Sequence, residues 1–187
     1  QNKTIYNDVL VFLKDRFRYY LKEKNIRHDI VEASINIFDI NKISLIFQKS
    51  KSLNKVINRQ IGNDIVSSYK RSFNILQSET KYLNNDLSNI TDPTIFKEEF
   101  EKNLLKKINE LKKYFSEISK DENFDETLLL LSSAKKEIFD FFDNVKVNDD
   151  SDFVKKNRLE LINILCKTFE NFIDFHLIKD INEQTNS

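Results

Sequence analysis

The chain of 187 residues contains one glycine, one proline and one cysteine, and its 30 basic side chains balance its 30 acidic ones. Average usage would supply roughly a dozen Gly and nine Pro, and turns between strands depend on both, so this composition favours long helices over a β-rich fold. The single cysteine excludes a disulfide framework and a thiolate metal site, and it predicts a reducing, cytoplasmic compartment.

Apolar residues recur at helical spacing along most of the chain, which predicts an all-α bundle of about seven helices. The first stripe, from Ile5 to Leu21, also contains Val9, Leu13 and Phe17. The predicted helices lie at residues 5–21, 28–38, 42–56, 63–76, 93–119 and 127–142, and the last runs to about residue 178 after a cap at 149–151. No run of 18 apolar residues occurs, so no membrane contact is expected.

Local signals set the predicted boundaries. Gly62, the sole glycine, is expected to interrupt the helical run, after which Asn63 or Asp64 caps the fourth helix. Asp92 and Pro93 predict the start of the fifth helix, because Asp accepts from free backbone N–H groups and Pro has no N–H to leave unpaired.

The remaining segments are polar. They predict a loop at 84–92, a turn at 120–123 and a frayed tail at 182–187. We expect one domain of residues 1–187, with a break between two sub-bundles allowed near 84–92. The chain lacks methionine, even at position 1, so it is expected to be a fragment of a longer protein.

No catalytic residue and no metal site is predicted. His28 and Asp29 form the dipeptide of the metal-dependent HD phosphohydrolases, but only one other histidine, His176, exists to complete such a ligand set. The alternative is that Asp29 caps the second helix or forms a salt bridge there. Cys166 lies among apolar residues of the last predicted helix, which favours a buried and inert thiol.

Three basic clusters are candidates for contact with phosphate. They are Lys14, Arg18 and Lys22 at four-residue spacing, then Lys70 and Arg71 with Asn74, and residues 155–158 at the start of the last helix. Taken alone, each cluster is more often a solvated surface than a nucleic-acid site. The net charge of zero also predicts that non-specific attraction to phosphate is modest.

Three segments, taken in order, resemble the C-terminal tRNA-binding domain of the bacterial glycyl-tRNA synthetase β subunit. FLKDRFRYYL at 12–21 and RHDIVEA at 27–33 resemble its opening. YKRSFNIL at 69–76 resembles its KR..NIL helix, and FFDNVKV at 141–147 with NRLEL at 157–161 resembles its FFD.V.V and NRL.L ending. The resemblance spans roughly residues 9–175, although residues 81–125 match only as generic helix.

This resemblance implies the fold of the helical anticodon-binding domain of arginyl-tRNA synthetase, of the class Ia type. It implies that the chain recognises tRNA(Gly), in its anticodon region, as part of glycine–tRNA ligase and performs no chemistry itself. A separate α subunit carries the aminoacylation site, in an α2β2 enzyme, and ATP, glycine and Mg²⁺ are used there. No cofactor is expected in this chain.

The positions that match the family's motifs are the candidate tRNA-binding residues. They are Arg16, Arg18, Lys70, Arg71, Asn74, Asn157 and Arg158. The alternative function is a helical protein–protein interaction module, because Phe-rich amphipathic helices with balanced charge suit it equally well. A continuous basic face would favour tRNA, whereas mixed charge with an exposed apolar patch would favour a protein partner.

Overall fold

The computed structural model describes residues 2–80, 87–117 and 123–179. Within these ranges every regular element is helical, which confirms the all-α prediction. The α-helices and 3₁₀ helices follow in chain order: α1 (Asn2–Glu23), α2 (His28–Asn36), η1 (Ile40–Lys42), α3 (Ile43–Val56), α4 (Gln60–Thr80), η2 (Pro93–Ile95), α5 (Glu99–Glu117), α6 (Phe124–Ser133), α7 (Lys135–Asn144), α8 (Asp152–Glu170) and η3 (Phe175–Leu177).

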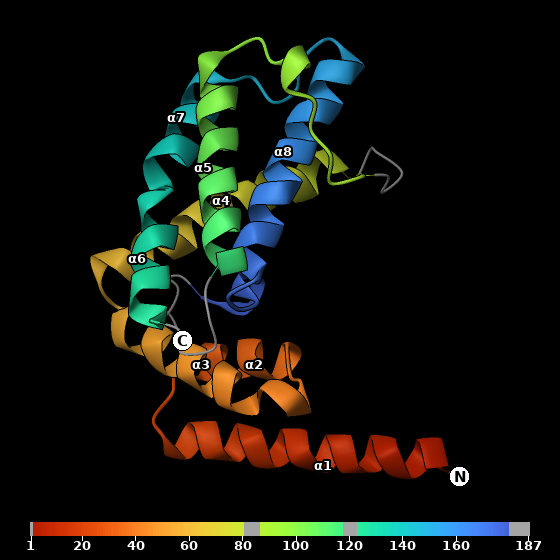
Figure 1. Ribbon diagram of the computed structural model, residues 1–187, viewed down its shortest axis with the longest axis vertical. Coiled ribbons are helices and arrows are strands. Elements are labelled where there is room, and N and C mark those ends of the chain that lie inside the picture. Colours follow the sequence, from red (N-terminus) through yellow and green to blue (C-terminus); the bar gives the residue numbers. More distant parts are fainter. Residues whose placement is uncertain (1, 81–86, 118–122, 180–187) are drawn as a thin grey trace.

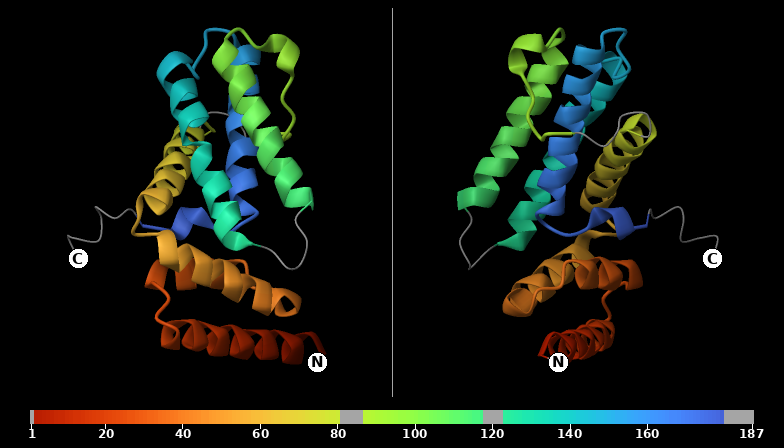
Figure 2. Two further views of the ribbon diagram at one scale, coloured as in Figure 1. Left: turned by 60° about the vertical axis from the view of Figure 1, so that its left-hand side comes forward. Right: turned by 90° about the vertical axis from the view of Figure 1, so that its right-hand side faces the viewer.

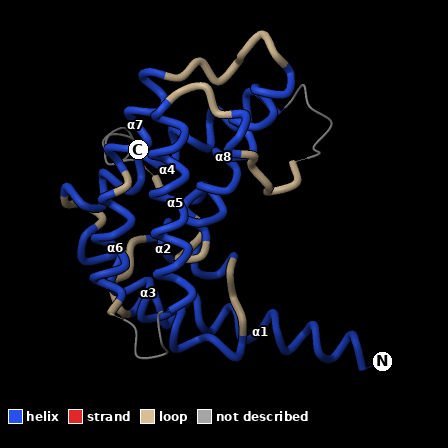
Figure 3. The backbone as a smooth tube through the Cα atoms, turned by 45° about the horizontal axis from the view of Figure 1, so that its top comes forward, coloured by secondary structure: helices blue, strands red, loops and turns tan. Residues whose placement is uncertain are grey.

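The helices form two groups stacked end to end (Figures 1 and 2). Helices α1, α2 and α3 lie across one end of the molecule. The second group holds α4 to α8, in which α5 packs against α7 and α8, while α4 crosses them and packs against α6, α7 and α8. Helix α1 packs against α2, and its N-terminal half extends beyond its neighbours (Figure 3).

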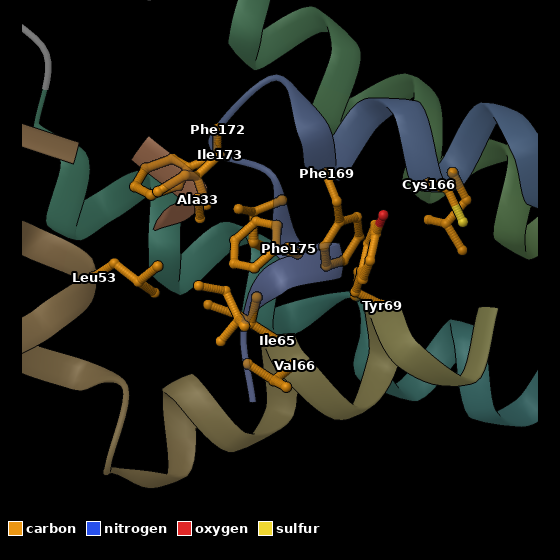
Figure 4. Close-up of a cluster of buried hydrophobic side chains, with 14 of the residues drawn as sticks. Ala33, Leu53, Ile65, Val66, Tyr69, Cys166, Phe169, Phe172, Ile173 and Phe175 are labelled. Atoms are coloured by element: carbon orange, nitrogen blue, oxygen red, sulfur yellow. The ribbon is translucent and has the colours of Figure 1, made fainter. Parts of the chain in front are cut away.

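Buried aromatic side chains join the two groups. Phe172 and Phe175, which follow α8, are fully buried, and Phe175 lies beside Tyr69 of α4. The ring centroid of Phe175 lies 5.8 Å from that of Tyr69 and 6.2 Å from that of Phe172. Figure 4 shows Ala33 of α2 and Leu53 of α3 beside this cluster, and both side chains are fully buried. The C-terminal segment therefore fills the space between the first helices and the rest of the bundle.

The predicted role of Gly62 was wrong, because this glycine lies inside the first turn of α4. The helical run is interrupted earlier, between Val56 and Gln60. A Cβ atom at Gly62 would lie 2.4 Å from the Cα atom of Ile57 and 2.5 Å from the carbonyl oxygens of Ile57 and Val56. Such distances are far below van der Waals contact. The glycine is needed because the end of α3 and the start of α4 approach each other closely.

The helix start predicted at Asp92 and Pro93 opens only a single 3₁₀ turn. The Asp92 carboxylate caps this turn as expected, accepting a 2.9 Å hydrogen bond from the backbone N–H two residues later. The long helix α5 begins after a break, where buried Glu101 accepts 2.8 Å hydrogen bonds from the backbone N–H groups of Lys97 and Glu98. This second cap fixes the start of α5 and was not recognised in the sequence.

The sixth predicted helix, 127–142, is two helices that meet at Ala134. The hydroxyl groups of Ser132 and Ser133 donate to the carbonyl oxygens three residues earlier, at 2.8 and 2.7 Å. Such side-chain bonds compete with the helical ladder and end α6. Both halves pack against α4, but α6 also lies against α3, whereas α7 lies against α5.

The salt bridge proposed for Asp29 is confirmed. Arg27 donates to both carboxylate oxygens of Asp29, at 2.7 and 2.5 Å, and the backbone N–H of Lys179 donates to the same carboxylate at 2.8 Å. The predicted tail at 182–187, residues 120–122 of the predicted turn and residues 84–86 of the predicted loop lie outside the described residues. The prediction of one domain over residues 1–187, with a break between sub-bundles allowed near 84–92, stays a prediction.

Candidate RNA-binding surface

The NRLEL motif at the start of α8 holds polar side chains that are buried. Asn157, Arg158 and Glu160 are 6%, 2% and 2% exposed. The Asn157 amide accepts a 2.7 Å hydrogen bond from the backbone N–H of Asp92 and donates a 2.9 Å bond to its carbonyl oxygen. The Glu160 carboxylate accepts from the backbone N–H groups of Ser88 and Asn89, at 2.5 and 2.8 Å. Both side chains tie the segment before α5 onto α8.

Arg158 connects three segments in the same way. Its guanidinium donates to the Glu101 carboxylate at 2.9 Å, to the Asp149 carboxylate at 3.0 Å and to the carbonyl oxygen of Lys146 at 2.8 Å. The backbone N–H of Ser151 and the side chains of Lys97 and Arg158 lower the pKa of Asp149 to about 2. Arg158 therefore holds the α7–α8 loop against the start of α5.

The KR..NIL and FFD motifs contact each other. Arg71 of α4 donates to the Asp143 carboxylate of α7 at 2.7 Å. Its guanidinium also lies 4.7 and 5.2 Å from the ring centroids of Phe139 and Phe142. These contacts bridge α4 and α7, although 32% of the Arg71 side chain stays exposed. Asn74, one turn further along α4, is exposed.

The two arginines of the first motif differ in their exposure and in their contacts. Arg18 is 31% exposed and pairs with Asp15 at 2.8 Å and with Glu32 of α2 at 3.1 Å, so it joins α1 to α2. Arg16 is exposed, and its guanidinium lies 5.1 Å from the ring centroid of Phe12 on the same helix. Lys70 is partly exposed. The seven candidates therefore do not form one surface, and their contact with tRNA stays a prediction.

A denser row of cations lies on α5, which the sequence analysis treated as generic helix. Residues 102–113 contain five lysines and one glutamate. Lys102, Lys106 and Lys113 share one exposed face, opposite buried Leu104 and Ile108. In the part of the chain that the structure describes, Lys102 and Lys106 have no carboxylate partner. Counting lysines helix by helix would have found this row.

The surroundings of the cysteine and of His176 do not indicate a catalytic or metal-binding role. Burial raises the pKa of the Cys166 thiol, with a further contribution from the charge of Glu170, so the reactive thiolate is disfavoured. His176 is exposed, with its ring centroid 4.5 Å from that of Phe73. Among the described residues no group of three or more His, Cys, Asp or Glu side chains could hold a metal ion. None of the described helices is long and apolar enough to cross a lipid bilayer.

Comparison with known proteins shows the family to which this chain belongs. The chain is similar to the glycine–tRNA ligase beta subunits of Rickettsia typhi (30% identical over 170 residues, 90% of this chain and 24% of the relative), Sulfurihydrogenibium sp. strain YO3AOP1 (30% over 167 residues, 89% and 24%) and Paracoccus denitrificans (24% over 172 residues, 92% and 25%). It thus spans about a quarter of the length of these relatives. The DALR anticodon binding domain matches residues 65–182, from the first turns of α4 onwards. The chain belongs to the DALR anticodon-binding domain family.

Proposed function

We propose that this chain is the tRNA-recognition domain of a glycine–tRNA ligase β subunit, that it binds tRNA(Gly) in the anticodon region, and that it performs no chemical step itself. The observation that carries the proposal is the DALR match over residues 65–182, which includes most of the second helix group. The similarity of 90% of the chain to glycine–tRNA ligase beta subunits supports the choice of tRNA(Gly).

The rest of the enzyme follows as part of this proposal. We expect the chain to work in the cytoplasm within an α2β2 assembly, with ATP, glycine and Mg²⁺ bound elsewhere, at a site on the α subunit. No cofactor is assigned to this chain. Glycine-dependent exchange between ATP and pyrophosphate, measured on the purified chain alone, is expected to be absent.

The structure divides the candidate contact residues by accessibility. Arg16, Lys70 and Asn74 are exposed or partly exposed, and Arg18 and Arg71 keep about a third of their side-chain surface. We propose that RNA contacts come from this accessible set and from the α5 lysine row. Asn157 and Arg158 support binding indirectly, because their side chains hold the segments around α5 in place.

A titration of the chain against tRNA(Gly) over a salt series tests the proposal. The logarithm of the affinity should fall linearly with the logarithm of the salt concentration, with a slope of about 0.7–0.9 per phosphate contacted. A tRNA(Gly) with a changed anticodon should bind more weakly, by roughly tenfold where one bidentate base interaction is removed. Equal affinity for tRNA(Gly), its anticodon variant and a non-cognate tRNA would remove the claim of anticodon recognition. No measurable RNA binding would favour the alternative of a protein–protein interaction module.

A further inference from the structure

Two adjoining hollows lie beside the C-terminal ends of α5 and α8. The larger, of about 390 Å³, opens between Lys49 of α3, Phe115 of α5 and Phe172. The smaller, of about 150 Å³, opens beside Lys167 of α8. Lys112 of α5 and Asn171 line both hollows, so the two adjoin, and we call them together the lysine hollow.

The charged residues that line the lysine hollow differ from those that line a third hollow. Among the residues that the structure describes, the lining of the two parts together includes three lysines and no acidic residue. A third hollow, of about 230 Å³ between α5 and α7, is lined instead by alternating charges: Lys106, Lys107 and Lys136 with Glu110, Glu137 and Asp140. Of these hollows, the lysine hollow therefore offers an anion a surface of one sign.

Two of its ammonium groups are available for an anion. Lys112 is exposed and forms no ion pair with any described residue. Lys167 donates to the neutral amide oxygen of Asn89 and pairs with no carboxylate among the described residues. Because both side chains line the smaller hollow, one phosphate group between them could accept hydrogen bonds from both.

The larger part of the hollow has aromatic side chains in its lining. Phe115 is partly exposed there, and the buried side chains of Phe124 and Phe172 also line this part. Unpaired bases of single-stranded RNA loops are recognised by stacking on aromatic rings, with lysines along the backbone. A volume of about 390 Å³ suits a single nucleotide and is too small for a paired stem.

We propose that the lysine hollow binds one unstacked nucleotide of a single-stranded RNA loop, with its base against Phe115 and its phosphate between Lys112 and Lys167. This inference rests on the proposed function, since it names the part of the domain that the tRNA loop would enter. The residues come from α5 and the C-terminal part of α8, and none of them belongs to the motif positions chosen from the sequence.

Three variants test the proposal by titration with tRNA(Gly) and with its isolated anticodon stem–loop. Lys112→Gln combined with Lys167→Gln should weaken binding to both by at least tenfold and should lower the salt slope by about 0.7 for each phosphate that the variant no longer neutralises. Phe115→Leu should weaken binding roughly tenfold, because the base has no ring to stack on, with little change in slope. Phe115→Tyr, which keeps an aromatic ring, should bind like the wild type. Melting curves confirm that each variant is folded.

The matched control is Lys51→Gln combined with Arg59→Gln. Both residues are exposed and outside the hollow, and the change of charge is the same. Its affinity should stay within about twofold of the wild type, as expected for rim charges that contact no phosphate. A blunt RNA duplex should bind the lysine variant and the control double variant alike.

Each failure has its own meaning. If the wild type binds tRNA(Gly) and the lysine and Phe115→Leu variants bind it with the same affinity as the wild type, the hollow is not the site and the proposed function stands. If the control double variant loses as much affinity as the lysine variant, net charge alone explains the effect and the proposed site is refuted. If the wild type binds no RNA, both the proposed function and this inference fall.

Discussion

At the scale of single residues, the polar side chains of the NRLEL motif hydrogen-bond to other segments of the chain and hold them against α8. A buried polar group is costly unless it is hydrogen-bonded, and Asn157, Arg158 and Glu160 each have at least two partners. Arg158 receives its partners from residues that lie 9, 12 and 57 positions away. No periodicity in the sequence reveals such partners, so the sequence offered Arg158 only as a candidate tRNA-binding residue.

Replacing Arg158 by methionine should strongly destabilise the fold. The variant keeps an apolar side chain of similar length but leaves the buried Glu101 carboxylate without its cation. Breaking a buried ion pair on one side costs about 3–5 kcal/mol of unfolding free energy. Urea denaturation measures this, and Lys156→Met, at an exposed position nearby, should change stability by less than about 0.5 kcal/mol. Equal stability of the two variants would contradict the role assigned to Arg158.

Asp149 should give the protein a dependence of stability on acid pH. Its pKa of about 2 in the folded protein lies below the ordinary value of 3.8, so its contribution is complete above about pH 4 and is lost as the pH falls towards 2. Asp149→Asn should therefore be less stable than the wild type at pH 6, and the difference should shrink between pH 4 and 2. Asp150→Asn, with a fully exposed side chain, is the control and should show no such convergence. A constant difference across this range would contradict the assignment.

At the scale of helices, the sequence predicted the periodic segments well and the breaks poorly. The stripe from Ile5 to Leu21 lies within α1, and every other predicted helix overlaps a helix of the structure. The missed breaks have causes outside the stripe. Glu101 caps α5 with one carboxylate oxygen while the other accepts from Arg158. The helix break at Ala134 lets α6 pack against α3 and α7 against α5, while both contact α4.

The candidate site was harder to predict than the fold. Motif positions such as Arg71 and Arg158 were selected because they match a pattern, and the structure shows that both bridge helices. Lys112 and Lys167 match no motif and are 55 positions apart in sequence, so only the packing of α5 beside α8 reveals that they line one hollow. A sequence pattern identifies the residues that build a fold more readily than the residues that lie on its surface.

Gly62→Ala tests the close approach of α3 and α4. Helix propensity alone predicts that alanine stabilises α4 by up to about 1 kcal/mol. The added Cβ atom, however, would lie 2.4 Å from the Ile57 Cα atom, and backbone cannot move aside as a flexible side chain can. We expect a net loss of about 1–3 kcal/mol, as for overpacked cores, in urea denaturation. Asn63→Ala, at the exposed next position, should be neutral or stabilising, and a stabilising Gly62→Ala would refute the close approach.

At the scale of the whole molecule, the residues after α8 connect the two helix groups. The 3₁₀ helix η3 packs against both α2 and α4, and the Asp29 carboxylate accepts from the backbone N–H of Lys179. The DALR match begins at Ile65, so α1 to α3 lie outside it while the connecting segment lies inside it. The C-terminal segment of the family domain therefore helps to position the first helix group, together with the packing of α3 against α4 and α6.

Phe175→Ala should loosen this connection more than it loosens either group. The ring of Phe175 is fully buried, and its removal from such a core costs about 3–5 kcal/mol. Hydrogen exchange followed by mass spectrometry should show that peptides from α2 and α3 lose protection by a larger factor than peptides from α5 and α8, because η3 packs against α2 and adds to the attachment that α3 makes to α4 and α6. Phe153→Ala, at a position 80% exposed on α8, should leave both groups protected. If Phe175→Ala lowers protection equally in both groups, the two groups unfold as one unit. The aromatic cluster is then part of a core that both groups share, and it has no separate role in attaching one group to the other.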